Sequence, residues 1–82
     1  MYDVRWKRSA LNRATELWLD APDRSEVTAA VAEIDRLLAS NPREAGESRS
    51  DSVRVLFVPP LGVFFEIDDL KHTVQVLRAW SF

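Results

Sequence analysis

The side chains best suited to binding or acting on an anion in this chain are a few arginines and one histidine. Arg78 stands between Leu77 and Ala79, close to the end of an alternating apolar run. As a permanent cation it could contact a phosphate or an acidic partner. The alternative, which we favour, is an arginine at the rim of the core whose aliphatic stem packs against Trp80.

Arg49 and His72 are two further candidates, one for anion binding and the other for proton transfer. Arg49 ends the segment "GESR", in which Gly46 and the cation could hold an anion, although a surface arginine paired with Glu47 or Asp51 is the simpler interpretation. His72 could act as a general base, because free imidazole titrates near pH ~6.5. With no partner beside it in the sequence, we favour an ordinary histidine at the edge of a strand.

The composition limits the class of protein. The chain has 82 residues, so we expect a single domain over residues 1–82. Hydrophobic residues make up 46% and charged residues 29%, which is typical of a folded globular protein. There is no cysteine and only one histidine, which excludes disulfides, thiolate zinc sites and multi-histidine metal sites. We expect no metal and no cofactor.

The net charge and the lengths of the apolar runs indicate where the protein resides and what it binds. The net charge is −2, so the chain lacks the basic excess that is usual for a nucleic-acid-binding protein. The longest apolar run, Val55–Phe65, is shorter than the ~20 residues that span a bilayer, and prolines and a glycine interrupt it. No basic and apolar leader is visible. We therefore expect a cytoplasmic protein with no membrane contact.

In the first half of the chain, one short strand is predicted first, and the apolar residues after it recur at helical spacing. Residues 2–6 alternate as a strand does, and Ser9 is expected to cap a helix that runs to Asp20. The apolar stripe over residues 24–40 predicts a second helix, with Asp23 as its N-cap and Asn41-Pro42 as its end.

In the second half of the chain, apolar and polar residues alternate with a period of two. Residues 43–52 are expected to form a polar loop, and strands are predicted over 52–58, 63–67 and 72–80. The short connections favour antiparallel hairpins. The sequence therefore predicts an α+β fold with the order β-α-α-β-β-β, in which a helical hairpin packs on a mainly antiparallel four-stranded sheet.

The alternation leaves open which face of the last strand the helices cover. One face would carry Val74, Val76, Arg78 and Trp80, and the other Thr73, Gln75, Leu77 and Ala79. Trp6, Trp18 and Trp80 are expected in the core. Glu66 is expected on the face opposite to Phe65 as a solvent-facing strand residue, and the alternative is a pair with Arg54 or Arg78 across the strands.

The phrases "IDRLLASNP", "GESR", "PLGVFFEID" and "VQVLRAW", in this order, resemble the RelE/ParE superfamily of bacterial type II toxins over nearly the whole chain. The resemblance implies a cytoplasmic toxin that a cognate antitoxin holds inactive. RelE-like members cut messenger RNA on the ribosome without a metal, whereas ParE-like members target DNA gyrase.

The resemblance also implies site residues. Cleavage of the RelE kind needs a base, a proton donor and cations for the phosphate charge. The candidate catalytic residues are Arg49, Arg54 and Arg78, and the candidate RNA or partner contacts are Lys71, His72 and Trp80.

Two departures from the RelE pattern decide between the interpretations. The strand over 63–67 has no arginine, and Phe82 has the shape of a tyrosine without the hydroxyl. We therefore favour a protein-binding member, ParE-like or catalytically degenerate. The alternatives are a RelE-like endoribonuclease and an α+β domain of similar shape without toxin activity.

Overall fold

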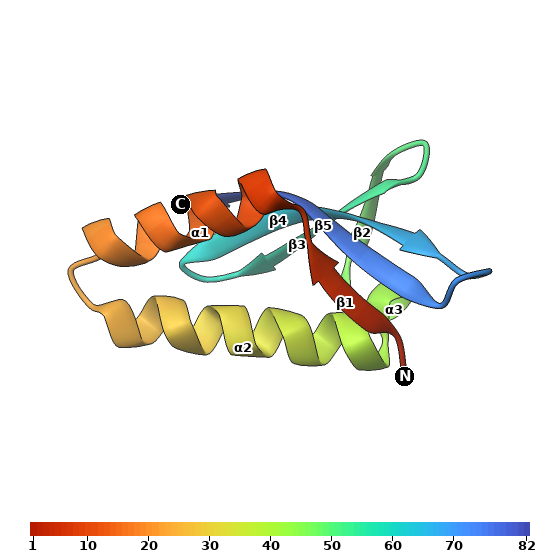
Figure 1. The fold of residues 1–82 in the computed structure, drawn as a ribbon, viewed down its shortest axis with the longest axis horizontal. Coiled ribbons are helices and arrows are strands. Elements are labelled where there is room, and N and C mark those ends of the chain that lie inside the picture. The colour runs from red at the N-terminus through yellow and green to blue at the C-terminus, as the bar shows by residue number, and fades with distance from the viewer.

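The computed structural model describes all 82 residues. They form two long helices, one short helix and five strands, joined by short connections. Their order is β1 (Asp3–Trp6), α1 (Arg8–Asp20), α2 (Arg24–Ser40), α3 (Pro42–Ala45), β2 (Glu47–Ser50), β3 (Val53–Val58), β4 (Leu61–Asp68) and β5 (Thr73–Ser81). The strands form one sheet in the order β1-β5-β4-β3-β2, with β1 parallel to β5 and the other pairs antiparallel. Figure 1 shows α1 and α2 side by side as an antiparallel pair. The α+β class is confirmed.

Helix α2 has the bounds that its apolar stripe predicts. Four buried residues, Val27, Ala30, Ile34 and Leu38, recur every three or four positions and face the sheet. Asp23 caps the helix by accepting a hydrogen bond from the Ser25 amide at 3.0 Å. The Ser25 hydroxyl and amide bind the ionised carboxylate and so hold the pKa of Asp23 below its ordinary value.

Helix α1 begins earlier than expected, and the prediction that Ser9 caps it is wrong. The N-cap is Lys7, which makes no side-chain cap bond. The Lys7 amide donates to the Val76 carbonyl at 2.9 Å, and the Lys7 carbonyl accepts from the Leu11 amide, also at 2.9 Å. The same residue thus ends the pairing of β1 with β5 and starts the helix, which places Ser9 inside the first turn.

The expected polar loop over 43–52 is also wrong, because this segment contains α3 and β2. Pro42 at the start of α3 is buried, and its fixed φ suits a first helical position. All four residues of β2 are exposed, so apolar alternation could not reveal the strand. Backbone pairing with the free edge of β3, Glu47 with Val55 and Ser48 with Arg54, forms it instead. The sheet therefore has five strands instead of four.

The core lies between the helix pair and one face of the sheet. Its thirteen buried residues come from α1, α2 and the three long strands, and Ile34, Leu38 and Phe65 are fully buried. Trp6 and Trp18 pack against this core as expected. Each indole N–H has a partner on α2: Trp6 donates to Asp35 at 2.7 Å, and Trp18 donates to Thr28 at 3.0 Å. None of the helices is both long enough and apolar enough to cross a bilayer.

Leu38→Ala is expected to lower the free energy of unfolding by about 2–5 kcal/mol, because it leaves a cavity at a fully buried position. Leu19→Ala is the matched control, since Leu19 is a helical leucine that is 52% exposed. That change should stay within about 0.5 kcal/mol. Urea denaturation followed by circular dichroism measures both, and equal effects would contradict this placement of the core.

Candidate functional site

A β-bulge divides β5 into two halves. Phe64 on β4 pairs with Arg78, but the next residue, Phe65, pairs with Val76. Leu77 is therefore an extra residue in β5, and the alternation of side chains reverses across it. This single register shift decides which side chains of β5 face the helices.

Neither of the two faces expected for the last strand exists as a continuous row. Val74 and Val76 face the helices and are fully buried, and beyond the bulge Ala79 takes the buried place. Arg78 and Trp80 lie on the opposite face of the sheet, which no helix covers and which we call the open face. The assumption that side chains alternate without interruption along β5 was wrong, because Leu77 is an extra residue in this strand.

Four aromatic side chains, Phe57, Phe64, Trp80 and Phe82, form an aromatic cluster on and beside the open face. The Trp80 ring lies 4.7 Å from Phe64 and 6.1 Å from Phe57, and Phe82 lies 5.5 Å edge-on from Phe57, measured between ring centroids. Phe57 remains 55% exposed and Phe82 65% exposed. The expectation that Trp80 belongs to the core is wrong, because the bulge turns it outward.

Gly62 on β4 shapes the centre of the aromatic cluster. It lies between Phe57 on β3 and Trp80 on β5 in the register of the sheet. A Cβ atom at this position would stand 2.6 Å from Cε2 of the Trp80 indole. The absence of a side chain therefore lets the indole lie directly on the backbone of β4.

Arg78 stands beside the aromatic cluster. Its side chain is exposed, lies across from Phe64, and makes no hydrogen bond or ion pair in the structure. It is free to meet an acidic or phosphate group of a partner. The aromatic rings around it carry no group that exchanges a proton near neutral pH, so the surroundings of Arg78 suit binding better than proton transfer.

Arg54 lies on the opposite side of the sheet from Arg78. Its register opposite Phe65 turns it toward the helix-covered face, where it is half-buried. The guanidinium donates to the carbonyls of Arg43 at 2.7 Å and Gly46 at 2.8 Å. Arg54 therefore ties α3 to the sheet, with its Nε buried and unpartnered.

Arg49 lies on the exposed edge strand β2. It sits at the register irregularity between Ser48 and Ser50, and its side chain has no partner. Strands β3 and β4 separate β2 from β5, so Arg49 and Arg78 stand on strands about 14 Å apart. The fold thus does not bring Arg49, Arg54 and Arg78 to one place.

His72 belongs to a cluster at the β4–β5 turn that the sequence interpretation did not find. Its ring stacks on Tyr2 with centroids 4.0 Å apart, and its φ of 57° lies in the left-handed region. The Tyr2 hydroxyl donates to Asp69 at 2.9 Å, and Arg43 pairs with the other oxygen of this carboxylate. These two bonds hold the pKa of Asp69 below its ordinary value, and the same carboxylate raises the pKa of Tyr2.

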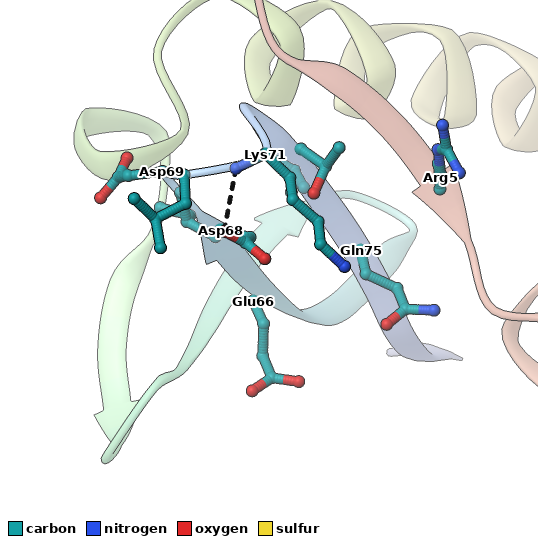
Figure 2. Close-up of a pocket in the computed structure, with 10 residues that line it drawn as sticks. Arg5, Glu66, Asp68, Asp69, Lys71 and Gln75 are labelled. Atoms are coloured by element: carbon teal, nitrogen blue, oxygen red, sulfur yellow. Dashed lines mark hydrogen bonds between the residues drawn. The ribbon is translucent and has the colours of Figure 1, made fainter.

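Lys71 lines a polar hollow of about 690 Å³ on the open face, next to this turn. Figure 2 shows its side chain extending along the hollow toward Gln75. Its amide donates to Asp68 at 3.1 Å. Glu66, also in the lining, accepts a hydrogen bond from Ser52 at 2.7 Å and pairs with neither of its two candidate partners, Arg54 and Arg78.

Lys71 and His72 are remote from Trp80. They lie at the start of β5 and Trp80 near its end, a separation of about 26 Å along an extended strand. The candidate contact residues therefore belong to two regions, the β4–β5 turn and the aromatic cluster. No group of three or more histidine, aspartate or glutamate side chains is arranged to hold a metal ion.

The sequence matches no protein-family model, and no curated protein matches it. The fold, in contrast, matches solved structures. A chain of the RelBE2 toxin–antitoxin complex from Mycobacterium tuberculosis has a TM-score of 0.83 and 20% identity over 99% of this chain and 91% of that chain. A chain of the chromosomal ParDE system from P. aeruginosa has a TM-score of 0.74 and 19% identity, over 99% and 96%.

The isolated RelE toxin from E. coli has a TM-score of 0.63 and 17% identity, over 99% of this chain and 84% of that chain. The chain therefore has the fold of the RelE/ParE toxins, which confirms at the level of fold the resemblance that the sequence suggests.

Asp69→Asn is expected to destabilise the fold at neutral pH and to matter less in acid. The hydrogen bonds from Tyr2 and Arg43 hold the pKa of the folded Asp69 carboxylate below its ordinary value, so its stabilising contribution is complete above the unfolded pKa and is lost as pH falls through the folded one. Urea denaturation between about pH 3 and 7 should show the difference from wild type shrinking below about pH 4. Asp20→Asn is the control, because the Asp20 side chain has no partner, and a difference that is independent of pH would contradict the argument.

Proposed function

We propose that this protein is the toxin component of a type II toxin–antitoxin system and that it works in the cytoplasm by binding proteins. An antitoxin encoded beside it would neutralise it. The solved structures that share its fold include toxin–antitoxin complexes, which supports an antitoxin as the cognate partner. The observation that carries the proposal is the open face, where exposed aromatic rings stand beside an unpaired arginine.

The aromatic cluster has the features of a protein-binding surface. Aromatic residues and arginine are enriched in such interfaces and supply most of the binding energy. Phe57 and Phe82 are among the large apolar side chains that remain most exposed, and Phe57 lies edge to face with both Phe82 and Trp80. A partner that covers these rings would remove apolar area from water without any rearrangement of the sheet.

The backbone next to the aromatic cluster is also available. Strand β1 pairs with β5 only from Thr73 to Val76, so no strand pairs with β5 on that side from Leu77 to Ser81, although the start of α1 lies close to Leu77–Ala79. An edge of this kind can accept a strand from a partner. An antitoxin segment could therefore combine main-chain pairing along β5 with side-chain contacts to the aromatic cluster.

The geometry supports a protein target, such as DNA gyrase, better than cleavage of messenger RNA on the ribosome. Cleavage needs cations, a base and a proton donor at one phosphate. Arg54 is committed to carbonyls on the helix-covered face, Arg49 stands on the far edge strand, and the rings beside Arg78 carry no proton donor. The endoribonuclease remains the alternative that the next experiment decides.

Expression of the chain alone is expected to arrest bacterial growth, and co-expression of the adjacent antitoxin should restore it. In a translation assay with isolated ribosomes, the message should stay intact with the wild-type protein. Cleavage of the message by the wild-type protein that is abolished by Arg78→Ala would instead establish the endoribonuclease. Normal growth with well-expressed protein would contradict the toxin assignment.

Phe57→Ser is expected to weaken antitoxin binding by at least about tenfold, because the ring contributes exposed apolar area at the centre of the proposed interface. Leu11→Ser is the matched control, since Leu11 is 52% exposed on the outer surface of the helix pair. Isothermal titration calorimetry measures both. A loss for Leu11→Ser with no loss for Phe57→Ser would place the antitoxin on the helices and overturn the assignment of the open face.

A further inference from the structure

A second surface, distinct from the open face, lies where the α1–α2 connection meets the β3–β4 turn. An apolar cleft of about 330 Å³ opens there, and we call it the tip cleft. Its apolar lining comprises Leu17, Ala21, Pro22, Val27, Pro60, Leu61 and Phe82. Leu17 and Val27 are buried, whereas Pro22 and Phe82 are exposed, so the cleft has a closed floor and open walls. A volume of this size accepts one long side chain with its neighbours.

The charges around the tip cleft all have one sign. Asp20, Asp23 and Glu26 line it, and no lysine or arginine does. Asp23 is engaged by Ser25, but the carboxylates of Asp20 and Glu26 accept no hydrogen bond and form no ion pair. The rim therefore presents two unpaired negative charges beside an apolar surface.

The nearest cation along the chain is turned away from the tip cleft. Arg24 stacks over Trp18, with its guanidinium carbon 4.7 Å from the ring centroid. It also donates to the Leu19 carbonyl at 3.2 Å. Arg24 is thus held against the side of the helix pair, and the negative charge of the rim is left without a partner from this chain.

The ends of α1 and α2 also contribute to the electrostatic potential at the tip cleft. Helix α1 ends at Asp20 with no basic residue in its last turn, so its partial negative charge at the C-terminus is not offset there. The partial positive charge at the start of α2 is offset by Asp23 as its cap and Glu26 in its first turn. A cation placed between Asp20 and Glu26 therefore meets a favourable potential.

We propose that the tip cleft binds an arginine side chain of a partner polypeptide, together with an apolar residue next to it. The planar guanidinium can reach both Asp20 and Glu26, and it can stack on the exposed ring of Phe82 in the way that arginine favours. The aliphatic stem would lie against Pro22 and Pro60. The proposal does not depend on the partner being an antitoxin.

The tip cleft is continuous with the aromatic cluster through Phe82. This ring lines the cleft and also packs edge-on against Phe57, 5.5 Å away between centroids. A second hollow of about 600 Å³ adjoins it and shares Glu26, Pro60 and Phe82 with the cleft; it also includes Glu33, whose carboxylate is already paired with Arg36. A polypeptide that covers the aromatic cluster can therefore continue into the tip cleft without crossing a basic surface.

The test is a titration of the ¹⁵N-labelled protein with the tripeptide acetyl-Leu-Arg-Leu-amide, followed by NMR. The control peptide carries citrulline, which has the shape of arginine without its charge. We expect the amide signals of Asp20, Glu26 and Phe82 to shift with the arginine peptide, and the citrulline peptide to bind about five- to tenfold more weakly. Raising the ionic strength should weaken only the arginine peptide.

Matched variants test whether the carboxylates of Asp20 and Glu26 bind the arginine peptide. The double variant Asp20→Asn and Glu26→Gln removes two exposed charges at nearly constant shape, and it should bind the arginine peptide about five- to tenfold more weakly. Glu44→Gln, an exposed carboxylate on α3, should bind as the wild type does. Equal binding of the two peptides, unchanged binding by the double variant, the absence of shifts, or shifts confined to another surface would each overturn the proposal.

Discussion

The extra residue at Leu77 is the constraint on which the surface of this molecule depends. On one side of this bulge β5 gives Val74 and Val76 to the core, and on the other side it gives Ala79. The helices can therefore pack against β5 on both sides of the bulge, because the small side chain of Ala79 occupies the last buried position. The same shift turns Arg78 and Trp80 to the open face, where Phe57 and Phe64 pack against the indole. Without the bulge, the arginine would face the core and the aromatic cluster would lack its central ring.

The two layers of the fold therefore have separate tasks. The helix-covered face holds the apolar residues that stabilise the protein, and Arg54 belongs to this layer because it ties α3 to the sheet. The open face and the tip cleft hold the groups that lack partners within the chain: exposed aromatic rings, the guanidinium of Arg78 and the carboxylates of Asp20 and Glu26. These groups differ in sign and lie at different places, so a single partner with an acidic and a basic region could engage both.

The sequence predicts the parts of the fold that side-chain periodicity controls. Helix α2, the three-strand meander and the α+β class follow from apolar spacing, and the Asp23 cap follows from local chemistry. Strand β2 could not be found in this way, because backbone pairing alone forms it and all its side chains are exposed. The bulge was equally hidden, since Leu77 is apolar in either register. The cluster of Tyr2, Arg43, Asp69 and His72 joins residues that are distant in the sequence, and no local motif marks it. Gly62 across from Trp80 was the one available signal for the aromatic cluster, because a strand glycine often marks a close approach.

The central proposal is that a partner antitoxin binds to the open face and not to the helix pair. Hydroxyl-radical footprinting of the protein, alone and in complex with the proposed antitoxin, tests this proposal residue by residue. The account predicts that oxidation of Phe57, Trp80 and Phe82 falls strongly in the complex, while Leu11 and Trp18 on the helix pair keep their reactivity. Protection of Leu11 and Trp18 with unchanged oxidation of Phe57 and Trp80 would contradict it.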